Sequence, residues 1–407
     1  MKKGIFKYEN GLLALLSVTF GLVFIDRFAL VYLSPYLVRD LHLNNTQLGL
    51  LVAALSLAWA VSGYFTTAWA EANHRKKAVF VTSVVLFSLA SITSGLASGF
   101  VILLCCRLLM GFFEGPTLPL IQSFIAKEST PSRTGLNMGI LQSFGSTLFG
   151  FLLAPVLLVA LADRYGWRST FFLTGLPGLM MALLCWKLIK PSTAIAVENQ
   201  SDASLSLREL WQYRNIRIGT ILACLLLTWL NACMTFMPRY FTEMQNFTEA
   251  EMGKTMGLMG VSSLLSGLLV TGLSDRFGRK PVTHLFLLMG IFFPLALLFL
   301  AGSGWQMPAM FLAYFMFGTV PIVLGVIPSE TVPAHSTAKA IGLLAGAGEI
   351  CGGVFTPFLC GLLADKFGLR APFYVAAGAA VMALLLSFSL VEPRQATAKN
   401  FVLASSE

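Results

Sequence analysis

Long apolar segments separated by short polar turns run through almost the whole chain, and they constrain its fold more than any other feature. A helix needs about 20 mostly apolar residues to cross a bilayer, whereas a strand of a membrane barrel shows only about ten residues of alternating character. The segments are too long for barrel strands, so we expect an all-α membrane protein with twelve transmembrane helices. They cover residues 11–36, 46–70, 78–97, 100–126, 135–161, 168–189, 217–242, 250–274, 281–302, 306–328, 337–363 and 370–391.

Charged residues are scarce, and their placement indicates an orientation. Only 12% of the residues are charged, against about 25% in a soluble domain. With both termini in the cytoplasm, 19 of the 28 Lys and Arg residues fall in cytoplasmic segments and 7 in outward loops. Such a bias is the pattern that orients membrane proteins. The net charge of +9 therefore needs no nucleic-acid partner, and we expect both termini in the cytoplasm.

Cysteines and histidines do not form a site for a metal, a cofactor or a nucleophile in the sequence. The cysteines lie in apolar segments without metal-ligand spacing, so they are expected to be buried as small hydrophobic residues. The histidines lie near segment ends, and no nucleophile has a partner at motif spacing. We expect no enzyme and no cofactor, with a proton gradient as the source of energy. The cysteines are Cys105, Cys106, Cys185, Cys224, Cys233, Cys351 and Cys360, and the histidines are His42, His74, His284 and His335.

The two halves of the chain repeat each other. Residues 149–172, FGFLLAPVLLVALADRYGWRSTFF, match residues 351–374, CGGVFTPFLCGLLADKFGLRAPFY, at an offset of 202. Six segments followed by six in the same order predict two six-helix bundles, with a site at their interface, an architecture suited to alternating access. We expect one bundle over residues 1–190, a cytoplasmic linker over 191–214 and the second bundle over 215–407.

Five charged residues lie well inside the apolar segments. An ionised residue at the centre of a membrane helix costs roughly 2.5–3.5 kcal/mol on insertion scales, so these residues must face a polar interior. Adjacent helical residues do not face each other, so Asp26 and Arg27 should have different partners. At the repeat offset they correspond to Thr228 and Trp229, which indicates that the fold alone does not require them. The five are Asp26, Arg27, Arg107, Glu114 and Glu349.

Residues 272–281, GLSDRFGRKP, resemble the turn between the second and third helices of each half in the major facilitator superfamily. The first-half copy at 68–77, AWAEANHRKK, is degenerate but keeps an acid and bases. The resemblance implies a gating role for Asp275, Arg276 and Arg279, with Glu71 and Arg75 in the first half. The alternative is that these bases only set the orientation in the membrane.

Four further stretches resemble the organic anion:proton symporters of this superfamily. They are FIDRFAL at 24–30, NNTQLGLL at 44–51, RLLMGFFEGPTLP at 107–119 and GWR at 166–168. The resemblance implies that Arg27 binds a substrate carboxylate, that Asp26 and Glu114 carry protons, and that Trp59 and Gln142 line the site. The alternative for Arg27 is a structural partner of Glu114.

Polar residues outside these stretches give weaker indications. Asn231 is a second-half candidate for substrate contact, although Gln142 and Asn231 could both simply bridge helices, as polar residues in membrane spans often do. Arg107 is expected to satisfy carbonyl groups at the edge of the cavity. Glu349 lies among small residues in AGAGEICGG, and it is expected either to titrate or to meet a cationic group on a zwitterionic substrate.

Together these features predict a secondary active transporter. We expect proton-coupled symport of a small organic anion or zwitterion by alternating access, by a monomer embedded in membrane lipid. The commonest location for so compact a chain of this kind is the inner membrane of a bacterium. The alternative is a proton-coupled exporter of drugs or metabolites.

Overall fold

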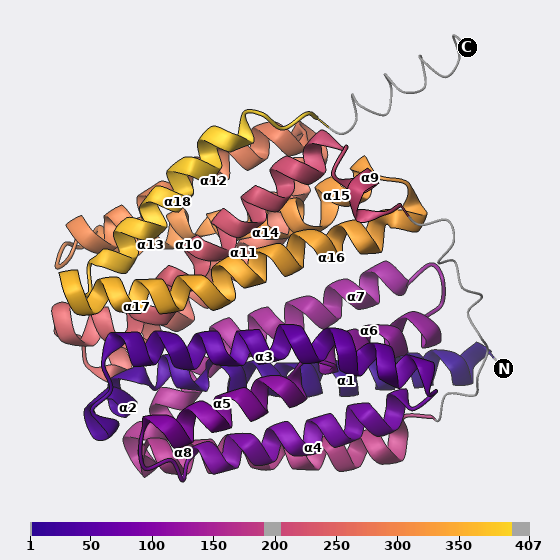
Figure 1. Cartoon of the computed structure of the whole chain (residues 1–407), viewed down its shortest axis with the longest axis horizontal. Helices are drawn as coiled ribbons and strands as arrows, with labels where there is room; N and C mark the ends of the chain where they lie inside the picture. Colours follow the sequence, from indigo (N-terminus) through magenta and orange to yellow (C-terminus); the bar gives the residue numbers. More distant parts are fainter. Residues whose placement is uncertain (1, 191–204, 393–407) are drawn as a thin grey trace. The chain divides into compact units, whose positions relative to one another are not determined.

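The computed structural model describes residues 2–190 and 205–392, and its regular elements in these ranges are all helices (Figure 1). Within these ranges, ten helices are long and apolar enough to cross a membrane. One of them, Thr134–Leu188, contains two crossings because Gly166 breaks it with φ 81°. The 17-residue helix Ala371–Ser387 completes the set. The twelve predicted crossings and the all-α class are therefore confirmed.

The first half contains helices that follow the predicted segments closely, with one early break. The predicted first segment, 11–36, ends early, because the helix stops at Tyr32 and a second one starts at Ser34 with Pro35 in its first turn. A proline is well placed there, since it has no N–H to donate. The elements are α1 (Lys2–Tyr32), α2 (Ser34–Leu41), α3 (Asn45–Ala72), α4 (Lys76–Ser94), α5 (Phe100–Glu114), α6 (Thr117–Glu128), α7 (Thr134–Gln142), η1 (Ser143–Leu153) and α8 (Ala154–Leu188).

The second half contains more irregular helices, including two π-helical and two 3₁₀ stretches. Most of the predicted linker over 191–214, namely residues 191–204, lies outside the described residues. The stretch from Leu205 to Tyr213 contains one short helix. The elements are α9 (Leu207–Leu210), α10 (Arg214–Met244), α11 (Glu249–Phe277), α12 (Arg279–Phe299), α13 (Gln306–Ala313), η3 (Tyr314–Gly318), α14 (Thr319–Pro321), η4 (Ile322–Val326), α15 (Ile327–Thr331), η5 (Ala334–Ser336), α16 (Thr337–Gly348), η6 (Glu349–Phe355), α17 (Thr356–Phe367) and α18 (Ala371–Ser387).

The chain forms two compact units. Unit 1 contains residues 1–194 and 237–261, and unit 2 contains residues 195–236 and 262–407. In unit 1, α1 packs against η1 and α8, α3 against α5, and α4 against α5 and α8. In unit 2, α12 packs against α13 and α18, and α17 packs against α18. The predicted boundaries at 190 and 215 remain predictions.

The sequence repeat has a matching repeat in the backbone. Gly166 and Gly368 both have positive φ, 81° and 86°, a conformation that glycine adopts readily. The π-helical stretches η1 and η6 end at Leu153 and Phe355, equivalent positions of the repeat, and Pro155 or Pro357 follows two residues later. A proline cannot donate to the carbonyl four residues before it, which favours a wider turn at that point.

The second-half counterpart of Arg27 is a core residue. Trp229 is 1% exposed, packs against the rings of Phe293 and Tyr314, and donates from Nε1 to the carbonyl of Gly290 at 3.0 Å. Unit 2 therefore uses this helix position for apolar packing. The charge at Arg27 is not a requirement of the repeated scaffold.

Candidate functional site

Arg27 of α1 and Glu114 of α5 form an ion pair inside unit 1. Nη1 of Arg27 lies 3.0 Å from Oε1 of Glu114, and Nη2 donates to Oγ of Ser56 at 3.4 Å. The guanidinium carbon lies 5.1 Å from the ring centroid of Trp59. The Glu114 side chain is 2% exposed and that of Arg27 is 15% exposed. The cation is therefore the accessible member of a pair whose carboxylate is buried.

Glycines of α5 bring this pair against α3. A Cβ at Gly111 would overlap the carbonyl of Leu55, and one at Gly115 would lie 2.6 Å from the carbonyl oxygen of Trp59. Only helices without side chains at such points can approach so closely, as is common in membrane bundles. The glycines of RLLMGFFEGPTLP thus place Glu114 beside the helix that carries Ser56 and Trp59.

This close approach predicts the effect of adding one methyl group. Gly111→Ala should lower the thermal stability of the purified protein by about 1–3 kcal/mol, the usual effect of overpacking, measured as a shift in Tm. Gly139→Ala on α7 is the matched control, because a Cβ there would meet nothing within 4 Å, and alanine is the better helix former. An unchanged Tm in Gly111→Ala would contradict the close packing of α3 and α5.

Asp26 points away from the Arg27 pair, as the spacing of adjacent helical residues predicts. It is 0% exposed, and its Oδ1 accepts a hydrogen bond of 2.9 Å from Ser91 of α4. The expectation that the two neighbours have different partners is confirmed. Oδ2 of Asp26 has no hydrogen-bond partner within the described part of the chain.

Arg107 lies in the interior of unit 1. It is 1% exposed, donates to Oγ of Ser94 at 3.4 Å, and lies 5.7 Å from the ring of Phe171. The expectation that it satisfies carbonyl groups was wrong, because its contacts are a hydroxyl and a ring. Its Nε and Nη1 have no hydrogen-bond partner among residues 2–190 and 205–392.

The GWR stretch at 166–168 holds the end of α2. Nε1 of Trp167 donates to Oδ2 of Asp40 at 3.2 Å, Arg168 pairs with the same carboxylate, and Nη2 of Arg168 donates to the carbonyl of Ala97 at 3.1 Å. The hydrogen bond from Arg168 holds the pKa of Asp40 below its usual value. The positive φ of Gly166 ends one crossing so that the next two side chains reach this carboxylate.

The other residues expected at the site lie in three different places. Gln142 is exposed at the end of α7, and its Nε2 donates to Oγ of Ser146 at 3.2 Å. Asn231 is partly buried in α10 and donates to the carbonyl of Leu227 at 3.0 Å, a hydrogen bond within its own helix. Glu349 is partly buried at the first position of η6. Asn231 and Glu349 belong to unit 2, and Gln142 to unit 1.

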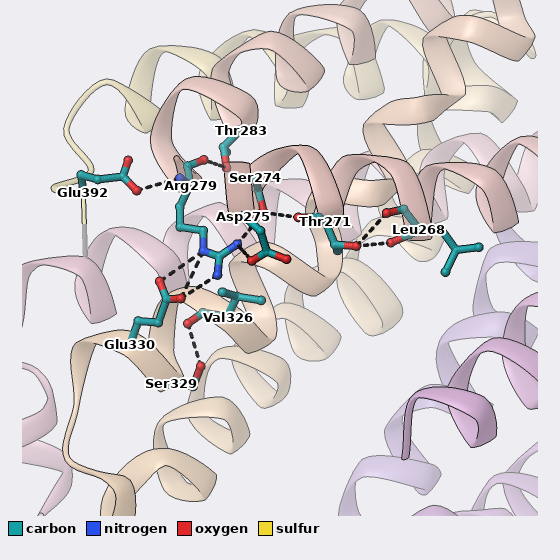
Figure 2. A network of polar contacts seen from close by, with 11 residues as sticks. Leu268, Thr271, Ser274, Asp275, Arg279, Thr283, Val326, Ser329, Glu330 and Glu392 are labelled. Atoms are coloured by element: carbon teal, nitrogen blue, oxygen red, sulfur yellow. Dashed lines mark hydrogen bonds and ion pairs between the residues drawn. The ribbon is translucent and has the colours of Figure 1, made fainter. Parts of the chain in front are cut away.

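Arg279 is the centre of a polar network in unit 2 (Figure 2). Its side chain is paired with Asp275 at 2.5 Å and with Glu330 at 2.7 Å, and Nη1 donates to Ser274 at 2.8 Å. Its backbone N–H donates to Glu392 at 2.7 Å. The network joins the ends of three helical segments and the chain after α18. Arg276, also expected in the gate, lies 5.5 Å from the ring of Phe277 and forms no ion pair among the described residues.

The degenerate copy in unit 1 has a simpler arrangement. Glu71 pairs with Lys76 at 2.8 Å, and Lys76 also donates to Oγ of Ser123 at 2.8 Å. Arg75, expected to supply the base, is exposed. His74 takes the place of Gly278 in the repeat, and both have positive φ, 54° and 100°. The two turns differ in length, because residues 73–75 separate α3 from α4, whereas Gly278 alone separates α11 from α12.

Sequence reasoning missed several polar partners. Glu330 and Glu392 complete the Arg279 network from positions far along the chain, and no local motif marks them. The serines that contact the intramembrane charges sit on neighbouring helices, where a serine in an apolar segment is a weak signal. These serines are Ser56, Ser91 and Ser94.

Comparison with known proteins finds a family and relatives that match most of the chain. The sequence model of the Major Facilitator Superfamily matches residues 16–350. A hexuronate transporter of Bacillus subtilis (strain 168) is 25% identical, over 91% of this chain and 92% of that protein. Multidrug resistance protein 2 of the same strain is 22% identical, over 95% and 96%. The crystal structure of a D-xylose-proton symporter superposes with a TM-score of 0.79 at 18% identity, covering 95% of this chain and 99% of that chain.

Proposed function

The chain belongs to the Major Facilitator Superfamily and is a secondary transporter in a membrane, and on that premise we propose that it moves a small organic anion together with protons. The proposed cycle is symport by alternating access, in which the two repeats move against each other. The substrate class includes zwitterions that carry a carboxylate. The relative named as a hexuronate transporter supports an anionic substrate.

The observation that carries the proposal is the ion pair between Arg27 and Glu114. A guanidinium fork suits a carboxylate, and its bonds to charged oxygens are about twice as strong as neutral ones. In the structure the protein's own carboxylate, that of Glu114, lies 3.0 Å from the Arg27 guanidinium. Protonation of Glu114 weakens its hold on Arg27 and leaves the cation available to a substrate anion.

Coupling follows from the cost of isolated charges in a low dielectric. Removing one partner from a buried ion pair is destabilising by about 3–5 kcal/mol. Substrate without a proton would leave Glu114 ionised without its cation, and a proton without substrate would leave Arg27 without an anion. Only the empty carrier, in which Arg27 pairs with Glu114, and the fully loaded carrier keep every charge paired. Asp26, buried beside Ser91, is the second proposed proton carrier.

Residues of both halves have proposed supporting roles. Trp59, within cation–π distance of Arg27, and Gln142 would contact the substrate in the first half, with Asn231 in the second. Glu349 would either titrate or bind a cationic group of the substrate. We propose that the Arg279 network and the Glu71–Lys76 pair open and close during the cycle, as gates of the two repeats.

The proposal predicts which compounds bind and what drives their uptake. Purified protein should gain thermal stability with one class among carboxylates, amino acids and amines, because a ligand that binds only the folded state stabilises it by mass action. In proteoliposomes, an inward proton gradient should then accumulate that compound, and a protonophore should abolish the accumulation. Uptake that is indifferent to pH and membrane potential would indicate a uniporter and overturn the proton coupling.

A second candidate function has one observation in its favour. The relative named Multidrug resistance protein 2 covers nearly the whole chain, so a proton-coupled exporter is the alternative. It predicts stabilisation by amines or neutral aromatic compounds, and efflux driven by an oppositely directed proton gradient. The intramembrane cation Arg27 is poorly suited to cationic drugs, which favours the anion.

A further inference from the structure

A cleft at one end of unit 2 combines basic and aromatic residues. Its volume is about 570 Å³, within the range of small-ligand pockets. It is formed by the start of α10, the turn between α11 and α12, and the chain that follows α18. The lining residues are Arg214, Phe277, Gly278, Lys280, Pro281, Phe388, Leu390, Val391 and Glu392.

Hydrogen bonds fix the wall of this cleft. Asn215 donates from Nδ2 to the carbonyl of Val391 at 2.9 Å and accepts from the N–H of Val391 at 3.0 Å. Glu392 accepts from the N–H groups of Arg279 and Lys280 at 2.7 and 2.9 Å, and Figure 2 shows Glu392 directed at Arg279. The chain after α18 is thereby joined to the starts of α10 and α12.

The two basic side chains of the cleft have more N–H donors than their hydrogen bonds within the protein use. Nε of Arg214 donates to the carbonyl of Ser389 at 3.0 Å, and Nζ of Lys280 donates to the carbonyl of Phe388 at 2.8 Å. A guanidinium has five N–H groups and an ammonium has three, so these single bonds leave donors on both. Neither side chain pairs with a carboxylate in the described ranges.

The acidic residues near the cleft form hydrogen bonds or ion pairs with other groups. Both oxygens of Glu392, the acid that lines the cleft, accept from backbone N–H groups at the start of α12, where a carboxylate is well placed. Asp275 and Glu330 both pair with Arg279. Neither basic side chain of the cleft is therefore in a direct ion pair, and the lining residues carry two positive charges against the one negative charge of Glu392.

The position of the cleft indicates which anion it fits. Two candidate membrane spans meet it, because Glu249–Phe277 ends there and Arg279–Phe299 begins there. Phe277 and Phe388 are 60% and 57% exposed, so two apolar rings lie at the surface beside the basic side chains of the cleft. Basic pockets between helices at this depth bind anionic lipid head groups.

We propose that this cleft binds the phosphate of an anionic phospholipid, with Arg214 and Lys280 contacting the phosphodiester and Phe277 and Phe388 packing against the lipid. The charge complementarity and the exposed rings together favour a lipid over a soluble anion.

The test is titration of the purified full-length protein with phosphatidylglycerol in detergent, followed by native mass spectrometry. One basic residue near the membrane surface contributes about 1 kcal/mol, or roughly fivefold in affinity. We expect Arg214→Gln and Lys280→Gln each to weaken binding of one lipid by about fivefold, and the double variant by about 25-fold. Lys339→Gln, which removes an exposed lysine outside the cleft, is the matched control and should bind as the unaltered protein does.

Further measurements distinguish between the possible anions, and they distinguish a loss of binding from a loss of folding. Phosphatidylcholine, with the same acyl chains and no net charge, should bind no better to the unaltered protein than to the double variant. The charge-conserving variant Arg214→Lys/Lys280→Arg should retain most of the phosphatidylglycerol binding, which shows that the charges and not a folding defect are responsible. Equal phosphatidylglycerol binding by the double variant would overturn the proposal. Binding of inorganic phosphate with the same dependence on Arg214 and Lys280, without binding of the lipid, would overturn the lipid assignment.

Discussion

Arg27→Gln should abolish concentrative uptake, and it should do so even when the loss of stability is repaired. The single variant leaves the carboxylate of Glu114, 2% exposed, without its cation, and breaking a buried pair in this way is destabilising by about 3–5 kcal/mol. The double variant Arg27→Gln/Glu114→Gln removes both charges and should recover most of the Tm. Substrate binding and exchange should remain absent, because no cation is left to bind the substrate carboxylate.

This pair of variants separates the two interpretations of Arg27. If Arg27 were only a structural partner of Glu114, the double variant would recover substrate binding and exchange together with stability, because neither requires a proton on Glu114. Arg27→Lys is the conservative control, since it keeps the charge but not the planar fork. We expect it to bind substrate at least about tenfold more weakly, the effect of losing one charge-assisted hydrogen bond of roughly 1.5 kcal/mol or more. Uptake by Arg27→Gln at the unaltered rate would refute the substrate role.

Glu114→Gln should separate substrate movement from proton movement. The amide resembles the protonated acid, so Arg27 would stay available to substrate at every pH. Exchange of labelled for unlabelled substrate across the membrane should persist, while accumulation driven by a proton gradient should fall to the background. The affinity of the unaltered protein should decrease as pH rises, because ionised Glu114 competes for Arg27, and that of the variant should be flat.

Asp26→Asn is the matched comparison for this experiment. Asp26 accepts from Ser91 and does not contact Arg27, so its neutralisation should not flatten the pH dependence of substrate affinity. A loss of proton-driven uptake in both variants would make both acids proton carriers. Accumulation that survives in Glu114→Gln but fails in Asp26→Asn would assign the coupling to Asp26 alone.

Features that depend on local sequence could be predicted well. The crossings follow from runs of apolar residues, and the reversal at Gly166 occurs at a residue whose backbone preference is strong. The helix break before Pro35 falls inside the predicted first segment and was not predicted. The different partners of Asp26 and Arg27 follow from the angle between adjacent residues of a helix. Each of these rests on interactions within a few residues of chain.

Partners across helices could not be predicted in the same way. Arg107 was expected to bond to carbonyl groups and instead contacts Ser94 and Phe171, because α4 packs beside α5 and α8 packs against α4. In the first-half turn, Lys76 and not Arg75 reaches Glu71. The sequence does not distinguish between two adjacent basic residues as partners of an acidic residue. Only the packing of the helices decides which of them contacts it.

The amino-acid sequence by itself determined the membrane location, the crossings, the repeat and the charged residues that an apolar interior must accommodate, since these depend on composition and period. Only the tertiary structure decided that Arg27 is held by Glu114 and that Glu330 and Glu392 gather around Arg279. The reason is physical: such pairings join residues far apart in the chain, and they arise where backbones without side chains, as at Gly111 and Gly115, allow helices to approach. Hydrophobic periodicity records which face of a helix is buried, but not which neighbour buries it.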